Sequence, residues 1–222
     1  MASVKKFTES AVVNQLRHIE RTIAHPENMD IDKDRTVQII HCYLNEESVI
    51  QYYRQRKSEL YCYNRTDVKV MAGWIVTAPK DLPMSEMENF FRVTYEFLAE
   101  RYGEKNCVQA VVHNDEGGQP HIHFLFIPAT ADKKHGGEKI CANDVLNKAE
   151  LRNFHSALQK CLLDHGVQAN ILTGITKVQG GNRTVRELKQ ENTKNRWHSR
   201  EYDKTEEKGQ KMGVNFFKII QK

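Results

Sequence analysis

The stretch 111-VVHNDEGGQPHIHFLFIP-128 places three histidines and two carboxylates around a Gly-Gly-Gln-Pro turn. Apolar residues flank this turn on both sides, which predicts two strands, 107–113 and 121–127, joined as an antiparallel hairpin. Because side chains alternate along a strand, His121 and His123 share one face, roughly 6 to 7 Å apart. The residues between them point to the other face, where helices are expected to cover them.

The histidines of this hairpin form a candidate metal site. His113 ends the first predicted strand, and antiparallel pairing can bring it opposite His121 and His123. Three neutral imidazoles leave coordination positions open for water or substrate oxygens, which is typical of catalytic metal sites. Asp115 and Glu116 lie in the loop beside them, where either can orient a ligand histidine or accept a proton. The alternative is that these histidines are hydrogen-bonded core residues.

Apolar spacing along the rest of the chain predicts helices interleaved with strands. One helix is expected to start at a capping box of Ser85 and Glu88 and to stop at Gly103. The last is expected to start at Asn147, with Leu151 and the apolar residues that follow it facing inward. The pattern predicts an α+β fold, a mainly antiparallel central sheet with helices packed on it. The other predicted elements are helices at 8–24 and 45–61, strands at 36–44 and 68–79, and a last helix that runs over 148–165.

Length and composition set the outer bounds. A chain of 222 residues can bury one substantial core and carry a tail. The core is predicted to close near residue 170, and residues 171–222 to form a polar, basic C-terminal extension. We expect a soluble, cytoplasmic protein, because the sequence has neither a signal-peptide layout nor a membrane-spanning apolar run. The five cysteines form no C-x-x-C pair and are expected to be reduced.

Two motifs resemble those of a known family. The pattern 113-HNDE-116, followed by 120-PHIH-123 and Pro128, resembles the signature of the Mob/Pre (MobV-type) plasmid mobilisation relaxases, which belong to the HUH endonucleases. Near the N-terminus, 18-HIER-21 resembles the H-N-x-R motif of that family. The resemblance covers about residues 1–170, and it implies an HUH relaxase domain there.

The chain also departs from the family pattern. Three residues separate Glu116 from Pro120 where the family usually has two, and Ile19 stands where the family has Asn. The family's N-Y-D/E-L motif falls on 41-HCYL-44, which lacks both the Asn and the acid. The sequence therefore resembles a divergent member, and no role is carried over to residues 41–44.

The resemblance implies a reaction and assigns its residues. A relaxase nicks one DNA strand at a transfer origin, stays attached to the 5′ phosphate and later rejoins the strand. The implied nucleophile is His18, and an imidazole suits this role because it is mostly neutral near pH 7, with a pKa of about 6.5 against about 10 for tyrosine. Arg21, on the same predicted helix face, would hold the phosphate, and Glu116 would act as the acid or base. The implied metal ligands are His113, His121 and His123, and the implied metal is Mn²⁺ or Mg²⁺.

Partners and alternatives follow from the same interpretation. The implied substrate is single-stranded and hairpin DNA at a transfer origin, with accessory mobilisation or coupling proteins as further partners. Three alternatives stay open: a tyrosine-dependent HUH endonuclease using 52-YY-53, another histidine-metal phosphoesterase, and a non-catalytic origin-binding protein. Cations and one aromatic residue are available to bind DNA. These candidates are Arg35, Arg54, Arg56, Lys57, Arg183, Arg186, Arg196, Arg200 and Trp197.

Overall fold

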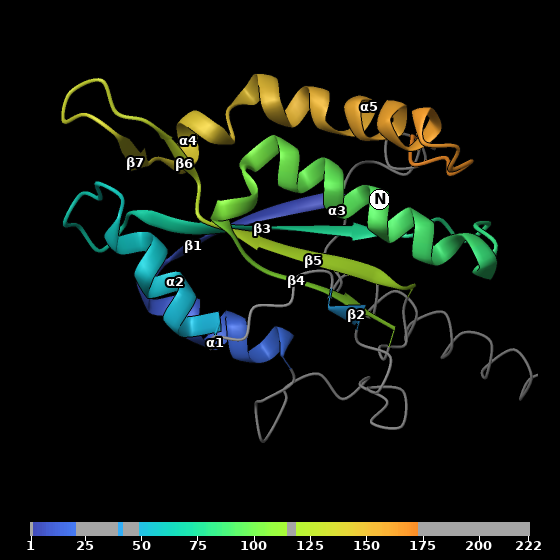
Figure 1. Cartoon of the computed structure of the whole chain (residues 1–222), viewed down its shortest axis with the longest axis horizontal. Coiled ribbons are helices and arrows are strands. Elements are labelled where there is room, and N and C mark those ends of the chain that lie inside the picture. The colour runs from blue at the N-terminus through green and yellow to red at the C-terminus, as the bar shows by residue number, and fades with distance from the viewer. Residues whose placement is uncertain (1, 21–39, 42–48, 115–118, 173–222) are drawn as a thin grey trace, which may run out of the picture. The chain divides into compact units, whose positions relative to one another are not determined.

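A computed structural model describes residues 2–20, 40–41, 49–114 and 119–172. Its centre is a five-stranded sheet with strand order β1-β3-β5-β4-β2, in which every pairing is antiparallel. Figure 1 shows helices on both faces of this sheet, which confirms the predicted fold class. The strands are β1 (Ala2–Thr8), β2 (Ile40–His41), β3 (Lys69–Thr77), β4 (Cys107–His113), β5 (His121–Phe126), β6 (Ala129–Ala131) and β7 (Glu138–Ile140), and the α-helices are α1 (Glu9–Ile19), α2 (Val49–Ser58), α3 (Met87–Tyr102), α4 (Ala142–Val145) and α5 (Lys148–Asp164).

The hairpin predicted from the opening stretch is β4 and β5, and two separate cores cover its two faces. On one face, Ile122, Phe124 and Phe126 pack under α3 and α5. Trp74 of β3 stacks on Phe154 of α5 in this core, with ring centroids 3.5 Å apart. Helices α1 and α2 cover the other face (Figure 1). The central strands are therefore buried on both sides, and the site described below stands on a rigid support.

The second core holds α1 against the sheet. Val12, Leu16 and Ile19 are fully buried, and they recur at the spacing of one helix face. They pack with residues of β3, β4 and β5, including Met71 and Leu125. This packing fixes where α1 ends, which matters because its last turn lies beside the histidines.

The predicted helix starts and ends were partly confirmed. The side chain of Asn147 accepts a hydrogen bond from the Glu150 amide, so the predicted start of α5 is confirmed. Leu151 was expected to face inward but is exposed. The predicted capping box is wrong: a 3₁₀ turn over Met84–Glu86 precedes α3, and no side chain caps the helix. Gly103 follows α3 with φ of 86°, as expected of a glycine that ends a helix.

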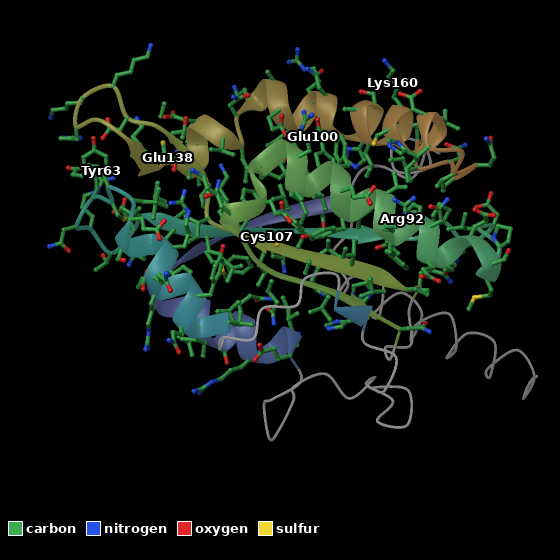
Figure 2. The ribbon with its side chains drawn as sticks, in the orientation of Figure 1. Tyr63, Arg92, Glu100, Cys107, Glu138 and Lys160 are labelled. Carbon is green, nitrogen blue, oxygen red and sulfur yellow. The ribbon has the colours of Figure 1, made fainter. Side chains whose placement is uncertain are left out.

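Several elements escaped the sequence analysis. Strand β1 alternates weakly and, among the described strands, pairs with β3 at the edge of the sheet, so it has little of the apolar patterning that marks a central strand. Strands β6 and β7 form a separate small sheet. Glu138 of β7, labelled in Figure 2, accepts hydrogen bonds from Arg56 of α2 and from Lys105. These charged contacts attach the small sheet to α2 and to the turn between α3 and β4.

Candidate metal centre

Strand register brings the three histidines of the hairpin together. His113 of β4 stands directly opposite His121 of β5, and His123 lies two residues further along β5 on the same face. Each of the three offers a ring nitrogen, and these three atoms lie within 4.8 Å of one another. The ring centroids are 4.7 to 5.6 Å apart. One ion can therefore contact all three imidazoles, as the spacing predicted.

Backbone carbonyls orient two of these rings. His113 Nε2 lies 2.9 Å from the carbonyl oxygen of Ile19, and His121 Nδ1 lies 3.0 Å from that of Gln119. A carbonyl oxygen only accepts hydrogen bonds, so each of these nitrogens carries the proton. The other nitrogen of each ring then has its lone pair available for a metal. Outer hydrogen bonds of this type are the usual support of metal-binding histidines.

The donor set fits a divalent transition metal. Imidazole nitrogens suit Zn²⁺, Cu²⁺, Fe²⁺ and Ni²⁺, and three of them leave coordination positions for the oxygen ligands that Mn²⁺ prefers. His113 and His123 are 1% and 8% exposed, whereas His121 is half-buried. The site is thus closed on the side of the sheet and accessible at His121, as a site that takes a substrate requires.

The end of α1 comes from a distant part of the sequence and contacts one of the candidate metal ligands. The carbonyl of Ile19, the last residue of α1, contacts His113 directly. His18 is the preceding residue and is half-buried. The predicted first motif and the predicted metal site therefore meet in space, although 94 residues separate Ile19 from His113. Arg21, Glu116 and Arg35 lie outside the described residues, so their predicted roles stay predictions.

The two tyrosines that were considered as rival nucleophiles are both engaged elsewhere. Tyr53 is 2% exposed and donates to Glu9, and burial together with that carboxylate raises the pKa of Tyr53. A hydroxyl that resists deprotonation is a poor nucleophile. Tyr52 is half-buried and donates to the carbonyl oxygen of Lys105.

The cations predicted to bind DNA differ in their surroundings. Arg54 is exposed on α2 and stays a candidate. The prediction for Arg56 is wrong, because its guanidinium is buried and donates to Asn106, Glu59 and Glu138. The remaining candidates in the C-terminal extension, Arg183, Arg186, Arg196, Arg200 and Trp197, lie outside the described residues.

The sequence analysis missed two kinds of group at this site. The carbonyls of Ile19 and Gln119 belong to the backbone, so no residue type marks them. Gln109 of β4 was also missed; it is buried on the face that carries the histidines. A signal existed for it, since a glutamine interrupts an otherwise apolar strand, 107-CVQAVV-112.

An antiparallel sheet that presents three converging histidines from adjacent central strands, beside a helix that carries a fourth, defines an α+β protein with a candidate metal centre on its central hairpin. The comparison with family models then assigns residues 1–190 to Mob_Pre, described as plasmid recombination enzyme. The chain belongs to the Mob/Pre family, as its motifs predicted.

Individual relatives agree with this assignment. A plasmid recombination enzyme of Lactiplantibacillus plantarum is 27% identical over 180 residues, 75% of this chain and 46% of that protein. One of Bacillus thuringiensis is 30% identical over 156 residues, 67% of this chain and 33% of that protein. This chain therefore matches less than half the length of either relative.

The fold also matches a solved structure. The MobM relaxase domain, crystallised with Mn and bound to oriT DNA of plasmid pMV158, is 24% identical, and the match covers 86% of this chain and 97% of that one with a TM-score of 0.68. This likeness supports the fold described above. Among the residues described, no helix is long and apolar enough to cross a membrane.

Proposed function

We propose that this chain is a metal-dependent relaxase that nicks and rejoins one DNA strand at the transfer origin of a plasmid or mobile element. The observation that carries the proposal is the meeting of two sequence motifs: the end of α1, with His18, lies against the three-histidine cluster. Membership of the Mob/Pre family supports it. So does the Mn-bound, oriT-bound state of the MobM relaxase domain.

In the proposed reaction, a ring nitrogen of His18 attacks the scissile phosphorus. A nitrogen–phosphorus bond forms as the bond to the 3′ oxygen breaks, and the 3′ oxygen takes up a proton and leaves as a hydroxyl. Arg21 is proposed to hold the phosphate, and Glu116 to accept the proton that the imidazole releases. Attack by a 3′ hydroxyl on the phosphohistidine reverses these steps and rejoins the strand.

His113, His121 and His123 would hold the metal, proposed to be Mn²⁺ or Mg²⁺. Bound there, the metal supplies Lewis-acid stabilisation of negative charge on phosphate oxygens. The chain's own contribution is orientation: the carbonyls of Ile19 and Gln119 fix the planes and tautomers of two ligand rings. Because the Ile19 carbonyl belongs to α1, the same contact sets the distance between the metal ligands and the helix that carries His18.

The proposal extends to substrate, partners and location. The substrate is single-stranded or hairpin DNA, with Arg54 and residues of the extension from 171 to 222 as candidates to contact phosphates. Accessory mobilisation or coupling proteins are proposed as further partners. A cytoplasmic location is proposed because the substrate is plasmid DNA.

The test is formation of a covalent adduct. The protein is incubated with Mn²⁺ and single-stranded oligonucleotides tiled across candidate origins, and denaturation-resistant complexes are mapped by mass spectrometry. We expect an adduct on His18 that is lost in His18→Ala and in His121→Ala. Tyr52→Phe is the matched control and should form the adduct normally. An adduct on Tyr52 would move the nucleophile, and turnover of small phosphodiesters without any adduct would favour a hydrolase.

A further inference from the structure

Gln109 is a buried amide whose polar atoms have no hydrogen-bond partner among the described residues. It lies in β4 with 4% of its surface exposed, and neither Nε2 nor Oε1 bonds to any residue that the structure describes. Leaving both ends of an amide unsatisfied in an apolar interior is costly, so such groups usually have a functional explanation. Gln109 lies in the second core, where an apolar side chain would carry no such cost.

Strand register places this amide close to one metal ligand. Gln109 pairs with Leu125 and Val111 pairs with His123, so Gln109 and His123 are diagonal neighbours on the face that carries all three histidines. Diagonal neighbours in an antiparallel pair are roughly 7 to 8 Å apart, within reach of a long side chain. A glutamine side chain can span that gap with its terminal carbonyl.

The other two ligands show what such a carbonyl would do. His113 and His121 each donate a ring N–H to a backbone carbonyl and present the opposite nitrogen to the cluster. We propose that Gln109 is a positioning residue for His123: when a metal binds, its Oε1, which has no partner among the described residues, turns to accept the N–H of the His123 ring nitrogen that faces away from the metal. The inference rests on the proposed function, because it requires a metal at the three histidines.

Thr94 provides a matched control. Its hydroxyl is also fully buried and has no hydrogen-bond partner in the described part of the chain, but it lies on α3, on the opposite side of the sheet from the histidines. Removing either group deletes an unsatisfied buried polar atom. Only the change at Gln109 should alter the affinity for a metal.

The test measures Mn²⁺ binding to the full chain without DNA, by calorimetry or by the electron paramagnetic resonance signal of free Mn²⁺. In Gln109→Met, which keeps the side-chain length without the amide, we expect the dissociation constant to rise about 10- to 100-fold. Gln109→Glu keeps an acceptor and should bind far better than Gln109→Met. Thr94→Val should bind as the wild type does.

Stability without metal separates positioning from simple packing. If Gln109 served only the fold, Gln109→Met would unfold at a lower temperature than the wild type in the absence of metal. A positioning role predicts an equal or higher unfolding temperature, since the substitution removes an unsatisfied amide. If the wild type binds Mn²⁺ and Gln109→Met binds it with the same affinity, this inference alone is overturned. If the wild type binds no divalent metal, the proposed function is overturned as well.

Discussion

Metal binding should stabilise the fold by an amount that follows from mass action. The three candidate ligands come from β4 and β5, and the contact between His113 and the Ile19 carbonyl extends the site to α1, so the intact site exists only when these elements are assembled. A metal that binds only the folded state at 100 times its dissociation constant adds about 2.7 kcal/mol to the free energy of unfolding. For a chain of this size about 1 kcal/mol raises the unfolding temperature by about 2 to 4 °C. We therefore expect a rise of about 5 to 11 °C.

The assay is thermal unfolding, followed by circular dichroism or calorimetry, at Mn²⁺ concentrations set from an independent binding titration. His121→Ala removes a ligand that is half-buried, so the apo protein should stay folded while the response to Mn²⁺ largely disappears. His165→Ala is the matched control, because His165 is an exposed histidine just beyond the end of α5. It should respond as the wild type does.

Two results would refute this reasoning. If His121→Ala and the wild type gain the same increment from Mn²⁺, the metal binds elsewhere and the three-histidine cluster is a set of core residues. If the wild type gains nothing while the titration shows tight binding, the metal also binds the unfolded chain. The claim that the site depends on the assembled fold would then be wrong.

Three further predictions concern the fold that carries the site. Phe154→Ala removes the ring that stacks on Trp74, and should cost about 3 to 5 kcal/mol in chemical denaturation. Gly73→Ala places a methyl group against Leu125 Cδ2 under α1, and should lower stability by about 1 to 3 kcal/mol in the same assay. Burial alone would raise the pKa of Glu150, but hydrogen bonds from two neighbouring side chains outweigh it and hold the pKa below its ordinary value. The stabilisation from this carboxylate is present above the ordinary pKa of 4.5 and is lost as the pH falls through the lowered value, so Glu150→Gln should flatten the acid limb of a stability-versus-pH curve.

The sequence predicted the parts of the fold whose pattern is strong and local. The β4–β5 hairpin was predicted because histidines and apolar residues alternate on both sides of a short loop. The start of α5 was predicted because Asn147 is followed at the right spacing by Glu150. Both features are specified by a few consecutive residues, so each can be predicted without knowing what packs against it.

Other elements depend on distant contacts and could not be predicted in the same way. Strand β1 carries Lys5 and Lys6, and its register is set by its long pairing with β3. Arg56 is buried because it pairs with Glu138, which lies 82 residues away in the sequence. The basic residues around Arg56 suggested a DNA contact, but in the fold its guanidinium forms an ion pair. The Ile19 carbonyl has no side-chain signature at all.

The position of the proposed nucleophile is a consequence of packing rather than of the motif that contains it. In the proposed reaction, His18 can act on a phosphate held at the candidate metal ligands only if α1 ends at the correct height above the sheet. Val12, Leu16 and Ile19 set that height by their burial, and the Ile19 carbonyl sets it again by its contact with His113. Packing and hydrogen bonding thus constrain the same helix end from two sides.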